Sequence, residues 1–206
     1  MKQAKFNSVQ DEWNKRAQRP GLQSVMSSRW SEEECQKATA LLKKEIFDIL
    51  GDLSGTKVLE IGCGIGRFTK DLAKKAVEVH AIDICPLMLK KAAKRIKNKN
   101  VYFLKASSSA LPFPANSFDL IFEVTVFQHI HDAKTFNNSV KQLKRVLKPG
   151  GRVFLCGVLK PTPRKSYSSI YRTVKEYKAV LYPLKLLKKK RYLCIEDPYT
   201  LMLFGS

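Results

Sequence analysis

The sequence predicts an α/β fold, in which a mostly parallel seven-stranded sheet carries helices on both faces and its last strand is antiparallel. Three observations predict it. Short apolar segments of strand length alternate with amphipathic segments of helix length from residue 56 to residue 159, a pattern typical of a parallel sheet covered by helices. Turns rich in glycine, proline and asparagine separate these segments. Two more apolar segments close the chain and predict a final hairpin with one antiparallel member.

A capping signal marks the first long helix, at 31–50. Ser31 can cap this helix, Glu34 completes a capping box, and apolar residues follow at helical spacing. Pro86 favours the first turn of another helix. The expected helices are 31–50, 68–76, 86–98, 132–147 and 167–190, the last broken at Pro183, and the expected strands are 56–62, 77–83, 101–107, 117–126, 151–159, 191–197 and 199–205.

The composition is that of one globular domain. Of the 206 residues, 44% are apolar and 27% are charged, which provides enough apolar material for a core. Residues 1–30 are polar and are expected to form a loosely structured arm or lid, and residues 31–206 the domain itself. No apolar run reaches the roughly 18 residues that a membrane span needs. The first residues have no apolar segment of the kind that a secretory signal contains.

Cysteine usage predicts the compartment. An odd and scattered set of cysteines, with no CxxC or CxxH pairing, argues against both a disulfide framework and a zinc site. We therefore expect no metal and a reducing, cytoplasmic setting. The five residues are Cys35, Cys63, Cys85, Cys156 and Cys194.

The chain is strongly basic, with 38 Lys and Arg against 18 Asp and Glu. The segment 159–193 holds eleven of the cations and one Glu, which is half of the net charge of +20. Tyrosines are interleaved with the cations, and three interpretations stay open. The segment binds tRNA or another RNA through phosphates and stacked bases, or it binds an acidic small molecule, a lipid headgroup or a membrane surface, or it is a solvated helix face.

Three glycines follow the first expected strand, in VLEIGCGIGRF at 58–68. Gly62, Gly64 and Gly66 lie at the carboxyl end of that strand, where open α/β sheets bind ligands. Glycine permits a positive φ and a close approach of a ligand to the backbone. The alternative is a tight strand-to-helix turn without a ligand.

An acidic residue ends the second expected strand. Asp83 follows Gly62 by 21 residues, a position from which its carboxylate can accept both hydroxyls of a ribose. Its alternative role is to cap the helix that starts at Pro86. The glycines and the acid together indicate a nucleoside ligand. A dehydrogenase is disfavoured, because Arg67 stands where a dinucleotide loop carries its third glycine.

Four segments in this order resemble the class I methyltransferases that use S-adenosylmethionine, in their small-molecule, UbiE-like branch: VLEIGCGIGRFT, VHAID, ALPFPANSFDLIFEVTVFQHI and LKRVLKPGGRVFL. The likeness covers about residues 40–158, and the final PYTLMLFG is similar to the family's last strand. It implies a Rossmann-like sheet, S-adenosylmethionine as cofactor and methyl transfer, with a small molecule as the expected acceptor. An RNA methyltransferase that uses 159–193, and a scaffold that binds the cofactor without catalysis, are the alternatives.

The resemblance also assigns roles to individual residues. Glu60 faces the amino end of the methionine, Asp83 binds the ribose and Ile84 lies beside the adenine. Ser107 stands where the family has an Asp for the adenine amino group, and a hydroxyl can accept the same hydrogen bond without charge assistance. Glu123 faces the methyl-transfer site. The complete set of expected cofactor residues is Glu60, Gly62, Cys63, Gly64, Gly66, Asp83, Ile84, Ser107 and Glu123.

Candidate catalytic groups follow the fourth expected strand. His129 is the preferred general base, because imidazole titrates near neutral pH, and its alternative role is packing beside the cofactor. Glu123 can orient an amine nucleophile or pair with a nearby cation. In the family pattern the N-terminal arm closes over the cofactor, so Trp13, Arg29 and Trp30 are expected to line a lid.

Overall fold

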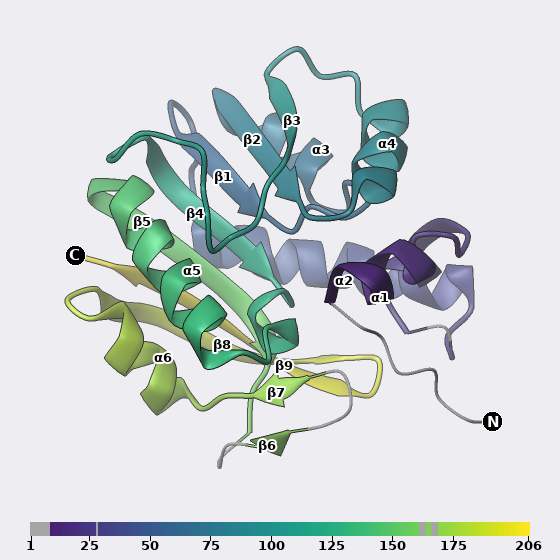
Figure 1. Ribbon diagram of the computed structural model, residues 1–206. Helices are drawn as coiled ribbons and strands as arrows, with labels where there is room; N and C mark the ends of the chain where they lie inside the picture. Colours follow the sequence, from purple (N-terminus) through teal and green to yellow (C-terminus); the bar gives the residue numbers. More distant parts are fainter. Residues whose placement is uncertain (1–8, 28, 161–163, 166–168) are drawn as a thin grey trace.

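The computed structural model describes residues 9–27, 29–160, 164–165 and 169–206. Its main sheet has seven strands in the order β3-β2-β1-β4-β5-β9-β8 (Figure 1). Strands β1 to β5 are parallel, and β9 runs antiparallel to both of its neighbours. The predicted α/β fold is therefore confirmed. The strands are β1 (Lys57–Ile61), β2 (Glu78–Asp83), β3 (Val101–Lys105), β4 (Phe118–Val124), β5 (Leu147–Val158), β8 (Lys185–Cys194) and β9 (Asp197–Gly205).

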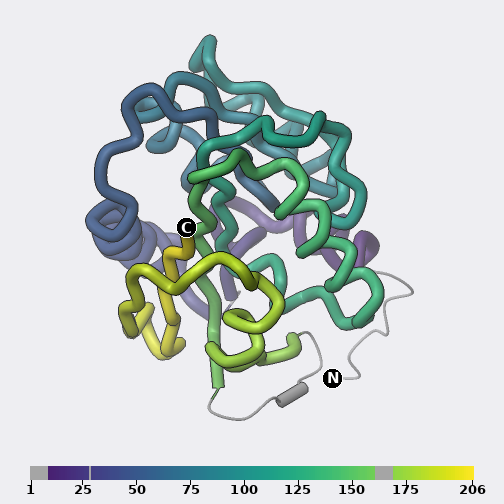
Figure 2. The backbone as a smooth tube through the Cα atoms, turned by 90° about the vertical axis from the view of Figure 1, so that its left-hand side faces the viewer, coloured from purple at the N-terminus to yellow at the C-terminus, as the bar shows by residue number. Residues whose placement is uncertain are grey.

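Helices cover both faces of this sheet. Figure 2 shows α2 and α5 on opposite sides of it. Val58 of β1 packs into the core on the α2 side, whereas the next residue, Leu59, packs under α5 and α6. Because successive side chains of a strand point to opposite faces, strands buried on both faces read as continuous apolar runs. The α-helices are α1 (Val9–Arg16), α2 (Glu32–Leu50), α3 (Thr69–Ala73), α4 (Pro86–Arg95), α5 (Ala133–Val146) and α6 (Val174–Leu181).

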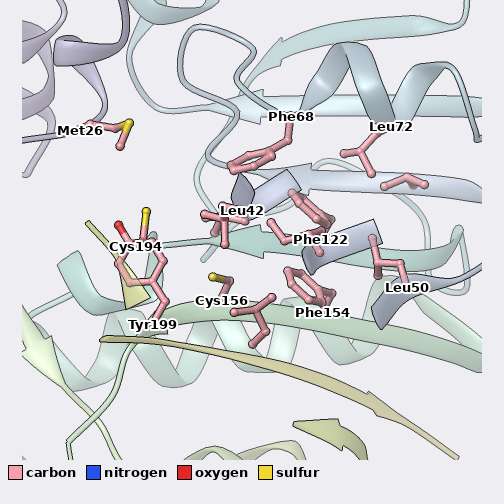
Figure 3. Packing of buried hydrophobic residues seen from close by; sticks show 14 of the residues in the cluster. Met26, Leu42, Leu50, Phe68, Leu72, Phe122, Phe154, Cys156, Cys194 and Tyr199 are labelled. Atoms are coloured by element: carbon pink, nitrogen blue, oxygen red, sulfur yellow. The ribbon is translucent and has the colours of Figure 1, made fainter. Parts of the chain in front are cut away.

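Aromatic side chains fill the core on the α2 side. Phe122 of β4 and Phe154 of β5 are stacked, with ring centroids 5.2 Å apart, and Phe68 meets Phe122 edge-on at 5.7 Å (Figure 3). Each buried phenylalanine contributes about 1.5–3 kcal/mol relative to an exposed one. Since Phe68 directly follows the glycine loop, this cluster fixes the loop on the sheet.

The start of α2 has the predicted capping box. The Ser31 hydroxyl accepts a hydrogen bond from the Glu34 amide at 3.2 Å, and the Glu34 carboxylate accepts one from the Ser31 amide at 2.7 Å. The arm before it is more ordered than expected. It forms α1 and the short 3-10 helix η1 (Gly21–Ser24), and Leu22 donates from its amide to Glu32 at 2.8 Å.

The helix predicted at 167–190, with a break at Pro183, is present only at Val174–Leu181, and the expectation that it continues after Pro183 is wrong. Helix α6 ends at Leu181, and the lysine-rich residues after Pro183 form β8 at the sheet edge. Proline interrupts the helix because it has no amide hydrogen and clashes with the preceding turn. Antiparallel pairing with β9 then outweighs the helical propensity of lysine and leucine. Residues 167–168 of the predicted helix lie outside the described part, as do 161–163.

Two short elements complete the fold. Strands β6 (Arg164–Lys165) and β7 (Ile170–Tyr171) pair with each other beside the main sheet, and the 3-10 helix η2 (Phe127–His129) follows β4. Where the chain is described, no helix combines the length and the apolar character needed to cross a membrane.

Candidate active site

A cavity of about 370 Å³ opens at the carboxyl ends of the central strands. This volume lies within the range of about 300–1,000 Å³ that is usual for small-molecule sites. Its walls come from the loops after β1, β2, β3 and β4 and from α1, which contributes Val9 and Trp13. Parallel strands bring these loops to one edge of the sheet, so residues far apart in sequence meet here.

The glycine loop forms one wall. Gly62 and Gly64 have φ angles of 71° and 55° and line the cavity together with Cys63. A Cβ on Gly64 would lie 2.7 Å from a methyl group of Val25, and one on Gly62 would overlap Val126. Both positions therefore require glycine for backbone conformation and for space.

Gly66 has a different role from the one expected. It is not among the residues that line the cavity, and a Cβ at this position would overlap the side chain of Ile96. The absence of a side chain lets the loop approach the end of α4 closely. Gly66 therefore serves packing, rather than contact with a ligand in the cavity.

Asp83 joins the glycine loop to the end of β2. One carboxylate oxygen accepts a hydrogen bond from the Gly64 amide at 2.8 Å, and the other accepts one from the Cys85 amide at 2.9 Å. Burial raises the pKa of Asp83. Each carboxylate oxygen has a second lone pair, so Asp83 can hold the loop and still accept hydrogen bonds from the cavity that it lines.

Ile84 and Ser107 line the cavity together with Asp83. The Ser107 hydroxyl lies 2.8 Å from the Ser109 hydroxyl and also accepts a hydrogen bond from the Ser109 amide at 3.3 Å. These contacts fix the orientation of the Ser107 oxygen. The sequence analysis expects Asp83, Ile84 and Ser107 to contact the same ligand, and all three line the one cavity.

Glu60 lies in the cavity wall and is only 2% exposed. Its carboxylate accepts a hydrogen bond from the Thr69 hydroxyl at 2.5 Å. Burial raises the pKa of Glu60 to about 8, and the neighbouring Asp83 adds to the rise. A cation beside Glu60 would favour its ionised form, so this acid is suited to an ammonium or sulfonium group.

His129 also lines the cavity and belongs to η2. Its ring meets the edge of the Trp13 indole, with centroids 5.2 Å apart and planes at 84°. His131 and Asp132 line the cavity too. Asp132 caps α5 by accepting hydrogen bonds from the hydroxyl and the amide of Thr135, each at 2.7 Å, and these bonds lower its pKa. His129 is thus the candidate base that α1 contacts directly.

Glu123 does not line this cavity, contrary to the expectation that it faces the transfer site. Its neighbours Phe122 and Val124 do line it, and alternation along β4 turns Glu123 to the other face. There its carboxylate accepts hydrogen bonds from the amides of Val126 and Phe127, the latter at 3.1 Å. Burial raises its pKa to about 7. Glu123 therefore holds the start of η2.

Several cavity residues were not assigned to the site from the sequence, among them Thr125, Arg67 and Val25. Thr125 has a φ of 61°, which is an outlier for a β-branched residue and typical of a functional site. Arg67 and Val25 also line the cavity. Only Arg67 had a signal in the sequence, as a cation inside the glycine loop. Of the expected lid residues Trp13 alone lines the cavity, since Trp30 is buried in the core and Arg29 stacks on Trp30.

The described residues contain no group of three or more side chains that could hold a metal ion.

Comparison with known proteins places this site in a family. A family model described as a methyltransferase domain matches residues 59–155. A demethylmenaquinone methyltransferase of Tropheryma whipplei is 34% identical over 129 residues, which is 63% of this chain and 52% of that protein. The chain thus spans about half the length of that relative. An uncharacterized methyltransferase of Bacillus subtilis, YdaC, is 32% identical over 137 residues, which is 63% of this chain and 73% of YdaC.

The fold agrees with this relationship. A S-adenosylmethionine-dependent methyltransferase of Leishmania major superposes with a TM-score of 0.78 at 20% identity, covering 96% of this chain and 81% of that one. The glycine loop and Asp83 both lie within the matched region. The chain belongs to the class I S-adenosylmethionine-dependent methyltransferase family.

Proposed function

We propose that this chain transfers a methyl group from S-adenosylmethionine to a small-molecule acceptor. One observation carries the proposal: a single cavity is lined by Gly62, Gly64 and Asp83 and also by His129 and Trp13. The name of the Tropheryma relative refers to a small molecule, which supports an acceptor of this size. The lining by α1 supports it too, because a lid over the cavity favours a ligand that can be enclosed.

The residues present fit the cofactor. Asp83 offers carboxylate oxygens for a ribose, Ile84 and Met88 offer an apolar surface for a base, and Ser107 offers a hydroxyl for its polar edge. Glu60 offers a buried acid for a positive group. When bound, S-adenosylmethionine supplies a methyl group already activated by a sulfonium charge.

The chain has two remaining tasks. It must hold the acceptor atom in line at about 3 Å from the methyl carbon, and it must exclude water. Phe68, Phe122 and Val124 give the cavity an apolar wall that serves the second task. If the acceptor atom carries a proton, His129 accepts it as general base. Glu123 supports this indirectly, through the backbone of η2.

The test begins with binding. Titration calorimetry of the purified protein with S-adenosylhomocysteine should give a stoichiometric complex, and Asp83→Asn should weaken it by about tenfold or more, because ribose hydrogen bonds to a charged acceptor are lost. Production of S-adenosylhomocysteine from S-adenosylmethionine with quinol-like small molecules then separates an enzyme from a scaffold. Absence of binding by the folded wild-type protein would contradict the proposal.

RNA methylation is the second candidate. It is favoured by four consecutive exposed cations at 188–191 of the edge strand β8. Lysines on an edge strand also prevent aggregation, and Tyr177 of the same basic segment is buried in the core. Retention on heparin, measured at increasing salt, distinguishes RNA binding from a role of the lysines in preventing aggregation. A steep loss of heparin binding with salt that disappears in Lys189→Glu/Arg191→Glu would favour RNA.

The proposal includes a cytoplasmic location. All five cysteines are buried free thiols, a state that suits a reducing compartment. Fractionation of source cells, with detection by antibody, would test it.

A further inference from the structure

A second and much smaller cavity lies beside the end of β4. Its volume is about 10 Å³, close to the lower limit for holding one water molecule. Its polar lining comes from Glu123, Thr125, Gln128 and Tyr177, and its apolar lining includes Met202. A buried water needs about two to four polar partners, and this cavity provides that many. It is therefore suited to one water molecule.

Thr125 connects the small cavity with the main one. Among the described residues it alone lines both. Its φ of 61° ends the alternation of β4, and its amide donates a hydrogen bond to the Cys156 carbonyl at 2.7 Å, which fixes the backbone in this unusual conformation. A threonine hydroxyl both donates and accepts hydrogen bonds. Thr125 is therefore suited to pass a proton from the main cavity to the small one.

Glu123 is the acid of the small cavity, and it is only 2% exposed. The amides of Val126 and Phe127 both donate to the same carboxylate oxygen, Oε1. An ionised carboxylate has about four acceptor sites, so Glu123 can hold the start of η2 and still bind a water molecule in the small cavity.

The groups that face Glu123 allow it to gain and lose a proton. Arg172 is positively charged, but it donates hydrogen bonds to two backbone carbonyls. Burial raises the pKa of Tyr177 and of Cys156, so both stay uncharged near neutral pH. The pKa of Glu123 itself is about 7, and a proton acceptor is most effective when its pKa lies near the working pH.

We propose that Glu123 takes up the proton that the methyl acceptor loses, and that the Thr125 hydroxyl and a water molecule in the small cavity carry it there. The inference rests on the proposed function. In the transfer, the acceptor atom forms a bond to the methyl carbon while the carbon–sulfur bond breaks, and the electron pair of that bond stays on sulfur. The proton leaves the acceptor for Thr125, directly or by way of His129. Thr125 gives its own proton to the water, the water gives one to the Glu123 carboxylate, and the neutral acid returns it to solvent by the same route after turnover.

Infrared spectroscopy tests the connection without any ligand, because a protonated carboxyl has its own C=O band. The spectrum of the wild-type protein minus that of Glu123→Gln isolates the band of Glu123, which should disappear as pH rises through about 7. Thr125→Val removes the hydroxyl and should shift this band, since the water bound to Glu123 loses a partner. Thr125→Ser should leave the band in place. Thr200→Val is the matched control, because Thr200 is 5% exposed and lines neither cavity.

Kinetics with the quinol that is turned over tests the role in the reaction. Glu123→Gln keeps an acceptor oxygen for the amides of Val126 and Phe127, so it separates proton uptake from support of η2. It should lower kcat by about a hundredfold and leave S-adenosylhomocysteine affinity unchanged. Thr125→Val should do the same, and Thr125→Ser should restore most of kcat. The double variant Glu123→Gln/Thr125→Val should lose no more than the larger single effect, because both changes interrupt one route.

Other outcomes overturn the inference. It fails if the Glu123 band does not titrate, if Thr125→Val leaves that band unshifted, or if folded Glu123→Gln protein keeps the kcat of the wild type. If Thr125→Val does not fold, Thr125→Ala replaces it, because it also removes the hydroxyl. Failure of the wild-type protein to bind S-adenosylhomocysteine would instead count against the proposed function, since the infrared measurement needs no cofactor.

Discussion

The indole of Trp13 packs edge-on against the imidazole of His129, with ring centroids 5.2 Å apart. The contact joins α1, near the start of the chain, to the turn after β4. Both residues line the cavity, so α1 and the candidate base meet in its wall. The guanidinium carbon of Arg16 also lies over the Trp13 ring, 4.5 Å from its centroid. The position of α1 and the orientation of the His129 ring therefore depend on each other through this contact.

This coupling predicts the effect of removing the indole. Trp13→Ala should lower turnover and weaken S-adenosylhomocysteine severalfold, because an aromatic pair of about 0.5–1.5 kcal/mol and part of the cavity wall are lost. Trp13→Phe keeps a ring and should retain most of both properties. Calorimetry and initial rates measure the effect. Wild-type values in Trp13→Ala would show that α1 does not act as a lid.

His129 has two possible roles that kinetics can separate. As a general base it contributes about 10²–10⁴-fold to the rate, so His129→Gln should lower kcat by that order while S-adenosylhomocysteine affinity stays within a factor of about two. As a packing residue it would change affinity more than kcat. The measurement requires an acceptor that is turned over, and normal kcat with that acceptor would exclude the catalytic role.

Arg172 and Glu123 fix the turn that carries His129. Arg172 donates from Nη1 to the Phe127 carbonyl at 2.6 Å and from Nη2 to the Ile130 carbonyl at 3.0 Å, while Glu123 accepts from the Phe127 amide. Arg172→Lys loses the fork that reaches both carbonyls. We expect kcat to fall by about tenfold, with unchanged cofactor affinity.

Arg145→Lys is the matched control for Arg172→Lys. Arg145 also donates to two backbone carbonyls, those of Leu111 and Phe113, but these do not belong to the turn that carries His129. It should lose comparable stability in urea unfolding and keep its kcat. If both variants lost kcat equally, the effect of Arg172→Lys would be explained by lower stability of the fold and not by the turn that carries His129.

Site residues whose position follows from the local sequence pattern were predictable, whereas those brought to the site by contacts between distant segments were not. Gly62, Gly64 and Asp83 stand at strand ends, a position that periodicity and turn chemistry reveal. The lysine-rich segment of β8 is different, because its structure is decided by pairing with β9. The contacts of Trp13 and Arg67 come from elements more than 25 positions away. These side chains became site residues only once the chain was folded.

Glu123 lies near the end of β4, as the sequence predicts, but its side chain does not line the cavity. Its apolar neighbours Phe122 and Val124 occupy the alternate positions that face the cavity, and strict alternation along a strand then turns Glu123 away. Because β4 is buried on both faces, its sequence alone does not say which face holds the ligand.

Burial of Glu60 predicts a pH-dependent stability. Its pKa is raised to about 8 in the folded protein, against about 4.3 for an unperturbed glutamate. The folded chain therefore holds a proton that the unfolded chain has released, so the free energy of unfolding should fall as pH rises from about 4.5 to 8. Urea unfolding across this range should show a decline of the order of a few kcal/mol. Glu123 contributes with the same sign up to about pH 7, so Glu60→Gln should reduce the decline without abolishing it.

Binding should release the same proton. A ligand that places a positive group beside Glu60 favours the ionised acid and lowers its pKa, so part of one proton should leave the protein when S-adenosylhomocysteine binds at pH 7. Calorimetry in phosphate and in Tris detects this release as a difference in heat, because the two buffers differ in ionisation enthalpy. The difference should vanish in Glu60→Gln, and it should be absent with 5′-methylthioadenosine, which carries no ammonium. Equal heats in both buffers for the wild-type protein would mean that no cationic group approaches Glu60.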